Sequence, residues 1–258
     1  MTIKILNLYA GIGGNRKLWS GDIEITAIEN NPEIAQIYKD FFPNDKVIVT
    51  DAHQYLLEHF KEFDFIWSSP PCQSHGVSRF WGSKANYKKM KYPSPIYPDM
   101  NLYQEIIFLK HFFKGKWVVE NVVGYYEPLI KPQQYRSHYY WSNFVIDGEK
   151  KDRRFISESK LSIYEEKFGM SFKDIKFKSV RKLQVIRNMV EPKAGLHIFE
   201  MAFKRPQLTL FGEEKQDRSF LGGYAELWNN PEDDRWDKEY NPNLLPKTLK
   251  TLEEKQDE

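Results

Sequence analysis

The sequence predicts a doubly wound α/β fold on a mostly parallel sheet, and three features of residues 1–120 predict it. Short apolar runs alternate there with segments of helical pattern. Those segments are long enough to be the crossover helices that parallel strands require. The first apolar run ends in Gly11-Ile12-Gly13-Gly14, a turn of the kind that opens a ligand site at the carboxyl edge of such a sheet.

Each strand is predicted from an apolar run bounded by polar or turn residues. In chain order the strands are Ile3–Tyr9, Glu24–Glu29, Lys46–Thr50, Phe63–Trp67, Lys116–Glu120 and His138–Ile146. Helices are predicted at Pro32–Phe41, Ala52–Phe60 and Asp99–Phe113, and further along at Arg181–Asn188 and from Pro192 to about Lys204. Pro32 suits the first turn of a helix, and Leu102, Ile106 and Leu109 recur at helical spacing.

These patterns divide the chain into four regions. Residues 1–146 hold the alternating strands and helices, and residues 147–180 are polar and weakly patterned. Residues 181–205 are expected to form helices that return to the first region. Residues 206–258 form an acidic tail with scattered Trp, Asn and Pro.

Composition limits the class of protein. Hydrophobic residues make up 41% of the chain, which is typical of a globular protein. No run approaches the ~18 apolar residues of a membrane span, so no membrane partner is expected. One cysteine and an N-terminus without a signal-peptide pattern predict an intracellular, cytoplasmic protein.

Charge is unevenly distributed along the chain. Residues 212–258 hold 13 acidic and 7 basic residues, whereas residues 1–211 carry a net charge of +8. A basic body suits a polyanionic partner such as nucleic acid, although a solvated surface with a chance imbalance explains the charge equally well.

The ends of the first three strands predict a cofactor site. Glycines after the first strand, in the run Tyr9-Ala10-Gly11-Ile12-Gly13-Gly14, let the backbone approach a ligand closely. Glu29, followed by Asn30, ends the second strand, where a carboxylate can accept both hydroxyls of a ribose. Asp51, followed by Ala52, ends the third, within reach of an adenine. The spacing departs from Gly-x-Gly-x-x-Gly, so S-adenosylmethionine, which has no pyrophosphate, fits better than a nicotinamide dinucleotide.

The next two strand ends predict reactive chemistry on the same rim. Cys72, the only cysteine, lies in Ser69-Pro70-Pro71-Cys72-Gln73 after the fourth strand. Glu120 ends the fifth strand, so the thiol and the carboxyl would share a pocket. A buried structural thiol and a helix-capping carboxylate are the alternatives, each plausible alone.

In these residues the chain resembles the DNA (cytosine-5) methyltransferases. Tyr9–Gly14 resembles the cofactor motif of that family, Glu29 and Asp51 its adenosine-binding acids, and Pro71-Cys72-Gln73 its nucleophile motif. Glu120-Asn121-Val122 resembles its Glu-Asn-Val motif. The later matches are Gln134 with Arg136–Asn143, which resemble the Gln-x-Arg-x-Arg motif and its strand, and Arg187–Pro192, which resemble the last motif.

The resemblance implies a Rossmann-like class I methyltransferase with an antiparallel final strand and a small recognition region at 147–180. It implies that the helix after the last motif folds back beside the cofactor loop, and it adds Pro70, Asn188 and Val190 to the cofactor site. Cys72 would add to C6 of a cytosine flipped out of duplex DNA, and Glu120 would hold ring N3 and the exocyclic amine. Arg136 would hold the cytosine O2 or a flanking phosphate. No metal is expected.

Two departures from the family pattern affect these expectations. His138 stands where the family has its second arginine, so Arg136 and His138 would divide the contact differently, and a histidine would make it dependent on pH. The recognition region is short, so recognition would be limited or shared with the tail or a partner.

The loop after the thiol is predicted to contact DNA. Residues 74–98 interleave five basic residues with five aromatic ones and contain no acidic residue, which suits phosphate contact and base stacking. A mobile surface loop is the alternative. The DNA-binding candidates are Gln73, Ser74, Arg79, Lys84, Lys88 and Lys89, and residues 149–187, with 12 basic and 6 acidic residues, form a second candidate surface.

The predicted enzyme belongs to a restriction–modification system, or is an orphan or phage methyltransferase associated with the nucleoid. Three other functions remain open for a chain of this kind. A tRNA cytosine-5 methyltransferase would explain the short recognition region. Ser69-Pro70-Pro71 partly matches amino-group methyltransferases, and a non-catalytic DNA-binding regulatory subunit would keep the same fold.

The tail contains a short peptide of recognisable chemistry. Gln207-Leu208-Thr209-Leu210-Phe211 resembles the peptides with which bacterial proteins bind the replicative sliding clamp. Gln207, Leu208, Leu210 and Phe211 would fill a hydrophobic groove on that partner. A hydrophobic segment that packs on the chain's own core is the alternative.

Overall fold

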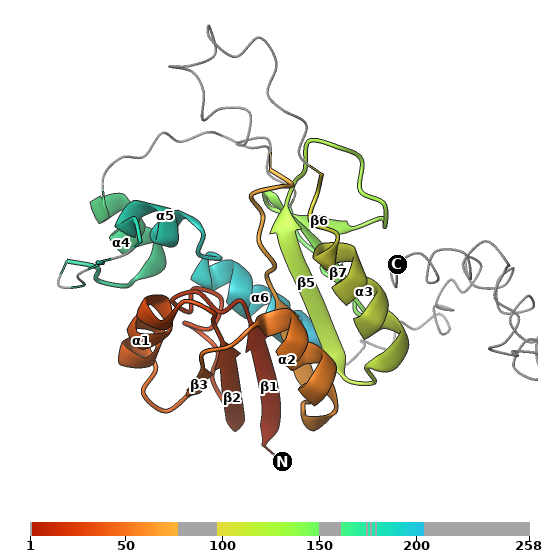
Figure 1. Ribbon diagram of the computed structural model, residues 1–258, viewed down its shortest axis with the longest axis horizontal. Coiled ribbons are helices and arrows are strands. Elements are labelled where there is room, and N and C mark those ends of the chain that lie inside the picture. Colours follow the sequence, from red (N-terminus) through yellow and green to blue (C-terminus); the bar gives the residue numbers. More distant parts are fainter. Residues whose placement is uncertain are drawn as a thin grey trace, which may run out of the picture. The chain divides into compact units, whose positions relative to one another are not determined.

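A computed structural model of the chain describes residues 2–76, 97–149, 161–173, 175, 177, 178 and 180–203. Within them, seven strands form one sheet in the order β3-β2-β1-β4-β5-β7-β6 (Figure 1). The strands are β1 (Ile3–Leu8), β2 (Ile23–Ile28), β3 (Lys46–Ile48), β4 (Phe65–Ser68), β5 (Lys116–Val122), β6 (Gln133–Tyr135) and β7 (His138–Ser142). The first five are parallel to one another, whereas β7 runs antiparallel to β5 and β6.

The helices are α1 (Pro32–Phe41), α2 (Ala52–His59), α3 (Asn101–Phe112), α4 (Leu161–Phe168), α5 (Lys182–Arg187) and α6 (Pro192–Phe203), with a 3₁₀ turn at Phe60–Glu62. Helix α1 begins where predicted because Pro32 follows Asn31, whose side chain accepts from the N–H groups of Glu33 and Ile34. Strand β6 and helix α4 were not predicted. The predicted doubly wound, mostly parallel sheet with an antiparallel final strand is confirmed.

Both faces of the sheet are covered, which is why its strands are apolar on both sides. Leu6 and Leu8 of β1 pack with α2 and α3, whereas Ile5 of β1 packs with α6 on the other face. Figure 1 shows α2 and α3 on one side of the sheet and α6 on the other. No helix in the described ranges is both long enough and apolar enough to cross a bilayer.

Strand register brings the predicted site residues into one row. Leu8 of β1 pairs with both Ile28 and Ser68, and Ser68 pairs with Val119 of β5. The residues that follow these, Tyr9, Glu29, Ser69 and Glu120, therefore lie side by side at the carboxyl rim. This alignment follows from the hydrogen-bonded ladder and does not depend on side-chain positions.

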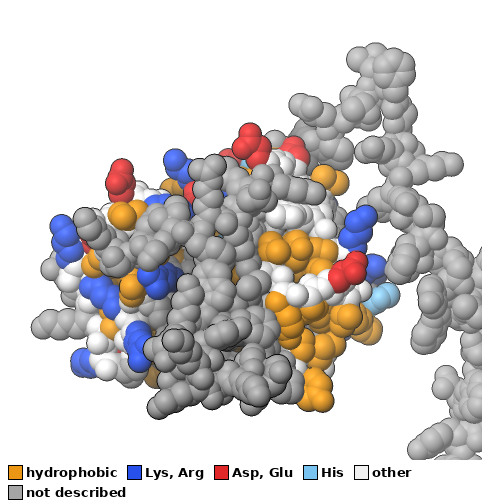
Figure 2. Space-filling model, turned by 90° about the horizontal axis from the view of Figure 1, so that it is seen from above, with side chains coloured by type: hydrophobic (Ala, Val, Ile, Leu, Met, Phe, Trp, Pro, Cys, Tyr) orange, Lys and Arg blue, Asp and Glu red, His pale blue; other side chains and the backbone are white. Residues whose placement is uncertain are grey.

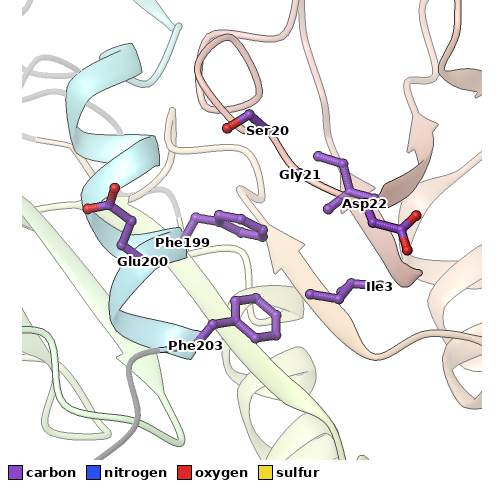
Figure 3. Close-up of a pocket in the computed structure, with 8 residues that line it drawn as sticks. Ile3, Ser20, Gly21, Asp22, Phe199, Glu200 and Phe203 are labelled. Atoms are coloured by element: carbon purple, nitrogen blue, oxygen red, sulfur yellow. The ribbon is translucent and has the colours of Figure 1, made fainter. Parts of the chain in front are cut away.

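A pocket of about 410 Å³ lies at the opposite edge of the sheet. Phe199 and Phe203 of α6 face Ile3, at the start of β1, across it (Figure 3). Because β1 and β2 run from this edge to the rim, the pocket is separated from the row of site residues by the length of those strands. It is mostly apolar and takes no part in the site at the rim.

Candidate active site

The chain turns tightly after β1, and the backbone there is strained. Tyr9, Gly11 and Gly13 have φ angles of 53°, 55° and 82°. Glycine adopts this left-handed region readily, whereas a non-glycine residue such as Tyr9 does so at a cost of about 1–3 kcal/mol. A Cβ placed on Gly11 would have no described atom within 4 Å, so open space lies against the turn.

Glu29 holds this turn in place. Its Oε2 accepts from the Gly11 N–H at 3.0 Å, and its Oε1 accepts from the Asn31 N–H at 3.0 Å. Burial raises the pKa of the Glu29 carboxyl, and the N–H groups of Asn31, Gly11 and Asn30 offset part of that rise. The carboxyl joins the ends of β1 and β2, and Glu29 is 9% exposed.

The groups at this site suit a cofactor without a pyrophosphate. N–H groups at a glycine turn commonly cradle phosphates, but here those of Gly11 and Asn31 already donate to Glu29. Asp51 adds a second acidic group and caps α2, its Oδ1 accepting from the Gln54 N–H at 2.8 Å. Carboxyl groups repel a phosphate and attract a cation. The residues present therefore fit the adenosine and sulfonium groups of S-adenosylmethionine better than a dinucleotide.

The last motif packs directly against the glycine turn. A Cβ on Gly14 would lie 2.3 Å from the carbonyl oxygen of Val190, so the two backbones touch. Gly195 of α6 approaches the backbone of Asn15 equally closely, and Trp19 Nε1 donates to the Gly195 carbonyl at 3.1 Å. Asn188 caps the end of α5 through its backbone N–H. The helix after the last motif thus folds back beside the cofactor loop.

The loop that carries Cys72 is anchored at three points. Ser69 Oγ accepts from Trp67 Nε1 at 2.8 Å, and the Pro70 carbonyl accepts from Asn121 Nδ2 at 3.0 Å. The Cys72 carbonyl accepts from the N–H groups of His75 and Gly76, both at 3.0 Å, which makes a turn directly after the thiol. Because Asn121 follows Glu120 in β5, its bond to Pro70 holds the thiol loop next to the strand that carries the carboxyl.

Glu120 lies inside β5, two residues before its end, and not at the strand terminus that the sequence predicted. The strand continues because β7 pairs with it there, with Asn121 opposite Tyr139 and Val122 opposite His138. Glu120 is 8% exposed, and its Oε1 lies 3.7 Å from Nε2 of His138. Of the two residues at the Gln-x-Arg-x-Arg motif, His138 is therefore the one beside the predicted catalytic carboxyl.

Arg136 interacts with a different carboxyl. Its Nη1 lies 2.5 Å from Oε1 of Glu191, and Lys167 lies 3.6 Å from the other oxygen of the same group. Burial alone would raise the pKa of Glu191, but the hydrogen bond and charge of Arg136, with those of Lys167, hold it below its usual value. The guanidinium thus ties the β6–β7 turn to the segment between α5 and α6.

The predicted nucleic-acid contacts are described only in part. Gln73 is exposed beside Cys72, and Ser74 Oγ accepts from the Asp99 N–H at 2.9 Å. Arg79, Lys84, Lys88 and Lys89 lie outside the described residues, as do Gln207, Leu208, Leu210 and Phe211 of the tail peptide. Figure 2, which views the molecule from above, shows Lys and Arg side chains gathered on the side where Figure 1 places α1, α4 and α5.

Sequence reasoning missed one residue at the centre of the rim. Glu105 of α3 is 0% exposed and contacts Tyr9, Ser68 and His53. A signal was present, because Glu105 falls on the apolar stripe of its helix, between the buried residues Leu102 and Leu109. A charged residue on such a stripe is almost never fully buried unless it is paired.

His53 gives this cluster a dependence on pH. The hydrogen bond of its Nδ1 with Glu105 raises the pKa of His53 above the usual 6.5, although burial opposes the rise. Because the pKa is higher in the folded state, the stabilisation is fully present below about pH 6.5 and is lost as pH rises through the folded-state pKa. We expect the free energy of unfolding, from urea titrations at pH 6 and pH 9, to fall more with pH in the wild type than in His53→Gln. Equal pH dependence of the two proteins would contradict this role.

Comparison with known proteins finds similarity to cytosine-C5 methyltransferases over the first part of the chain. The family model for C-5 cytosine-specific DNA methylases matches residues 3–122. A tRNA (cytosine(38)-C(5))-methyltransferase of Spodoptera frugiperda is 35% identical over 80 residues, which are 28% of this chain and 24% of that protein. The chain therefore spans less than two thirds of that relative's length.

Two solved structures are also similar. A mutant of Spodoptera frugiperda DNMT2 shares 22% identity at a TM-score of 0.38, over 58% of this chain and 54% of the other. The Entamoeba histolytica methyltransferase EhMeth shares 16% identity at a TM-score of 0.36, over 64% and 60%. The family match spans the glycine turn, the thiol loop and Glu120-Asn121-Val122, so over residues 3–122 the chain is similar to the C-5 cytosine-specific DNA methylases.

Proposed function

We propose that the chain transfers a methyl group from S-adenosylmethionine to C5 of a cytosine flipped out of duplex DNA, through a covalent bond between Cys72 and C6. The observation that carries the proposal is the bond from Asn121 to Pro70, which holds the thiol loop beside the strand of Glu120. By strand register, the thiol loop and Glu120 follow residues that pair side by side with those before Glu29 and the glycine turn, so all four are at the same end of the sheet. The family match over residues 3–122 supports the same chemistry, and its members' cofactor is S-adenosylmethionine.

Cytosine C5 is a poor nucleophile, and addition of the thiol to C6 makes C5 more nucleophilic. The Cys72 thiolate forms a bond to C6, and the electron pair of the C5–C6 double bond moves toward C5. S-adenosylmethionine supplies, when bound, the electrophilic methyl group that C5 takes. A base then removes the C5 proton, the C6–S bond breaks, and the double bond reforms with release of the thiolate. The target cytosine must flip out of the duplex because its C6 is inaccessible while the ring is stacked.

Glu120 and His138 hold the ring during thiol addition in this proposal. Glu120 contacts N3 and the exocyclic amine, which stabilises the charge that develops on the ring. His138 lies 3.7 Å from Glu120, whereas Arg136 is paired with Glu191. We therefore assign the base contact to His138, and to Arg136 the role of fastening the C-terminal helices.

Basic side chains supply the phosphate contacts in the same proposal. The described ones near α4, α5 and α6 are Lys167, Lys173, Lys178, Arg181, Lys182, Arg187 and Lys193. Among them, Lys167 lies 3.6 Å from Glu191, the partner of Arg136. Binding through such groups weakens as salt rises, since it releases counterions from the nucleic acid.

Trapping on 5-fluorocytosine tests the proposal. Fluorine at C5 cannot leave as a proton does, so the covalent complex accumulates once the methyl group is transferred. We expect the full chain with S-adenosylmethionine to form a denaturant-resistant adduct with duplex DNA that contains 5-fluorocytosine, and peptide mass spectrometry to locate it on Cys72. Non-fluorinated DNA of the same sequence is the control.

A tRNA substrate is the second candidate, favoured by one observation. The Spodoptera frugiperda relative is named as a methyltransferase that acts on cytosine 38 of tRNA. An adduct with 5-fluorocytosine tRNA and none with duplex DNA would replace the first proposal by this one. An absence of adduct on both, with S-adenosylmethionine still bound, would instead favour a regulatory subunit that has kept the fold.

A further inference from the structure

Glu105 is a buried acidic residue that the proposed chemistry does not use. It lies in α3 with no exposed surface, among apolar neighbours that include Leu102, Ile106 and Leu109. A carboxyl group in such a place is costly unless it is fully hydrogen-bonded. Its partners therefore explain why it is there.

Three donors from three different elements meet at this carboxyl. Oε1 accepts from the Tyr9 hydroxyl at 2.6 Å, and Oε2 accepts from the Ser68 hydroxyl at 2.6 Å. His53 Nδ1 of α2 lies 3.1 Å from Oε1. Burial, with the charge and hydrogen bond of Glu105, raises the pKa of the Tyr9 hydroxyl well above its usual value, so Tyr9 stays a donor.

The two hydroxyl donors lie at the starts of the two functional loops. Tyr9 follows β1 and leads into the Gly11–Gly14 turn, and its own backbone is in the left-handed region at φ 53°. Ser68 is the last residue of β4 and leads through Pro70 and Pro71 to Cys72. Strained backbone of this kind persists only where other contacts fix it, and the Tyr9–Glu105 bond is such a contact.

We propose that Glu105 is a positioning residue that couples the cofactor loop to the thiol loop. One carboxyl oxygen holds the chain where it enters the glycine turn, and the other holds it where it enters the Pro-Pro-Cys loop. The carboxyl group thereby fixes the start of the cofactor loop relative to the start of the thiol loop. Proline at positions 70 and 71 restricts the backbone between Ser68 and Cys72, so a shift of Ser68 moves the thiol with it.

This inference rests on the proposed function for its purpose, but its test needs neither nucleic acid nor methyl transfer. Two quantities are measured on the full chain: the Kd for S-adenosylmethionine, and the rate at which iodoacetamide alkylates Cys72 without cofactor. Because Cys72 is the only cysteine, the second measurement reports on one atom.

If Glu105 couples the two loops, a substitution at the start of one loop should change the quantity measured at the other loop, which we call its far effect. Tyr9→Phe, made in the cofactor loop, should change the alkylation rate of Cys72, and Ser68→Ala, made before the thiol, should weaken cofactor binding. A hydrogen bond to a charged group corresponds to roughly tenfold in either quantity. In a Glu105→Gln background both far effects should shrink, because the shared carboxyl is gone.

Ser142→Ala is the matched control. Its hydroxyl also makes a 2.6 Å bond within the sheet, to the Phe144 carbonyl, but at the opposite edge from the rim. Ser142→Ala should change neither the Kd for S-adenosylmethionine nor the alkylation rate of Cys72. The inference is overturned if Tyr9→Phe and Ser68→Ala lower the melting temperature alone, if each acts only on its own loop, or if the far effects survive in Glu105→Gln. A wild type that binds cofactor and shows these far effects, yet forms no adduct on fluorinated nucleic acid, would overturn the proposed function and leave the coupling standing.

Discussion

Cys72→Ser is expected to abolish methyl transfer and covalent trapping while leaving cofactor binding intact. A serine hydroxyl has nearly the shape of the thiol but is far less ionised, so it adds poorly to C6. Loss of a covalent nucleophile costs on the order of 10⁴- to 10⁶-fold in kcat. Transfer of a labelled methyl group to duplex DNA, with cofactor affinity measured in parallel, checks this expectation.

Retained folding is the control for that variant. Asn121, Trp67 and the turn after residue 72 hold the thiol loop through backbone and neighbouring side-chain atoms, none of which is the Cys72 sulfur. Because serine is also close to cysteine in size, the melting temperature should stay close to that of the wild type. Full activity in Cys72→Ser would instead favour an amino-group methyltransferase, for which Ser69-Pro70-Pro71 would be the relevant part of the loop.

Glu120→Gln is expected to lower kcat by about 10²- to 10⁴-fold, the range for losing a positioned acid–base group. The amide keeps the shape of the side chain but cannot exchange a proton with ring N3. The Kd for S-adenosylmethionine should be unchanged, because the cofactor contacts are expected at Glu29 and Asp51. Single-turnover methylation and trapping rates on 5-fluorocytosine DNA measure the effect, and both should fall together.

Glu127→Gln provides the same chemical change at an exposed position after β5. It should leave methylation within a factor of about two, since surface substitutions away from special features change little. Equal losses in the two variants would mean that net charge on this side of the molecule, and not the Glu120 contact, controls the rate.

Local sequence predicted most of the elements because their signals are local. Helix α1 is found at the predicted bounds, where Pro32 and the Asn31 cap act within a few residues. Strand β6 was missed because it has three residues and forms only by pairing with β7. Helix α4 was missed because Tyr164 and Phe168 stand among charged residues in the sequence. They are buried in a cluster that includes Ile37 of α1 and Val185 and Ile186 of α5.

The site residues show the same division. The positions of Glu29, Asp51 and Cys72 could be read from apolar runs and the residues that stop them, although Asp51 and Cys72 lie on loops three and four residues beyond the ends of β3 and β4. The ion pair of Arg136 with Glu191 could not, because 55 positions separate the two residues along the chain and nothing near either one signals the other. Glu105 was overlooked for a similar reason, although its place on an apolar stripe was visible.

The sequence by itself determined the alternation of strands and helices, the glycine turn and the single thiol, since each depends on the backbone preferences and polarity of adjacent residues. Only the tertiary structure decided that His138 lies beside Glu120, that Arg136 fastens the C-terminal helices, and that one buried carboxyl joins Tyr9 to Ser68. These pairings arise when the sheet register and the helix packing bring distant residues within 4 Å, and short-range hydrogen bonds then select among the groups that meet there.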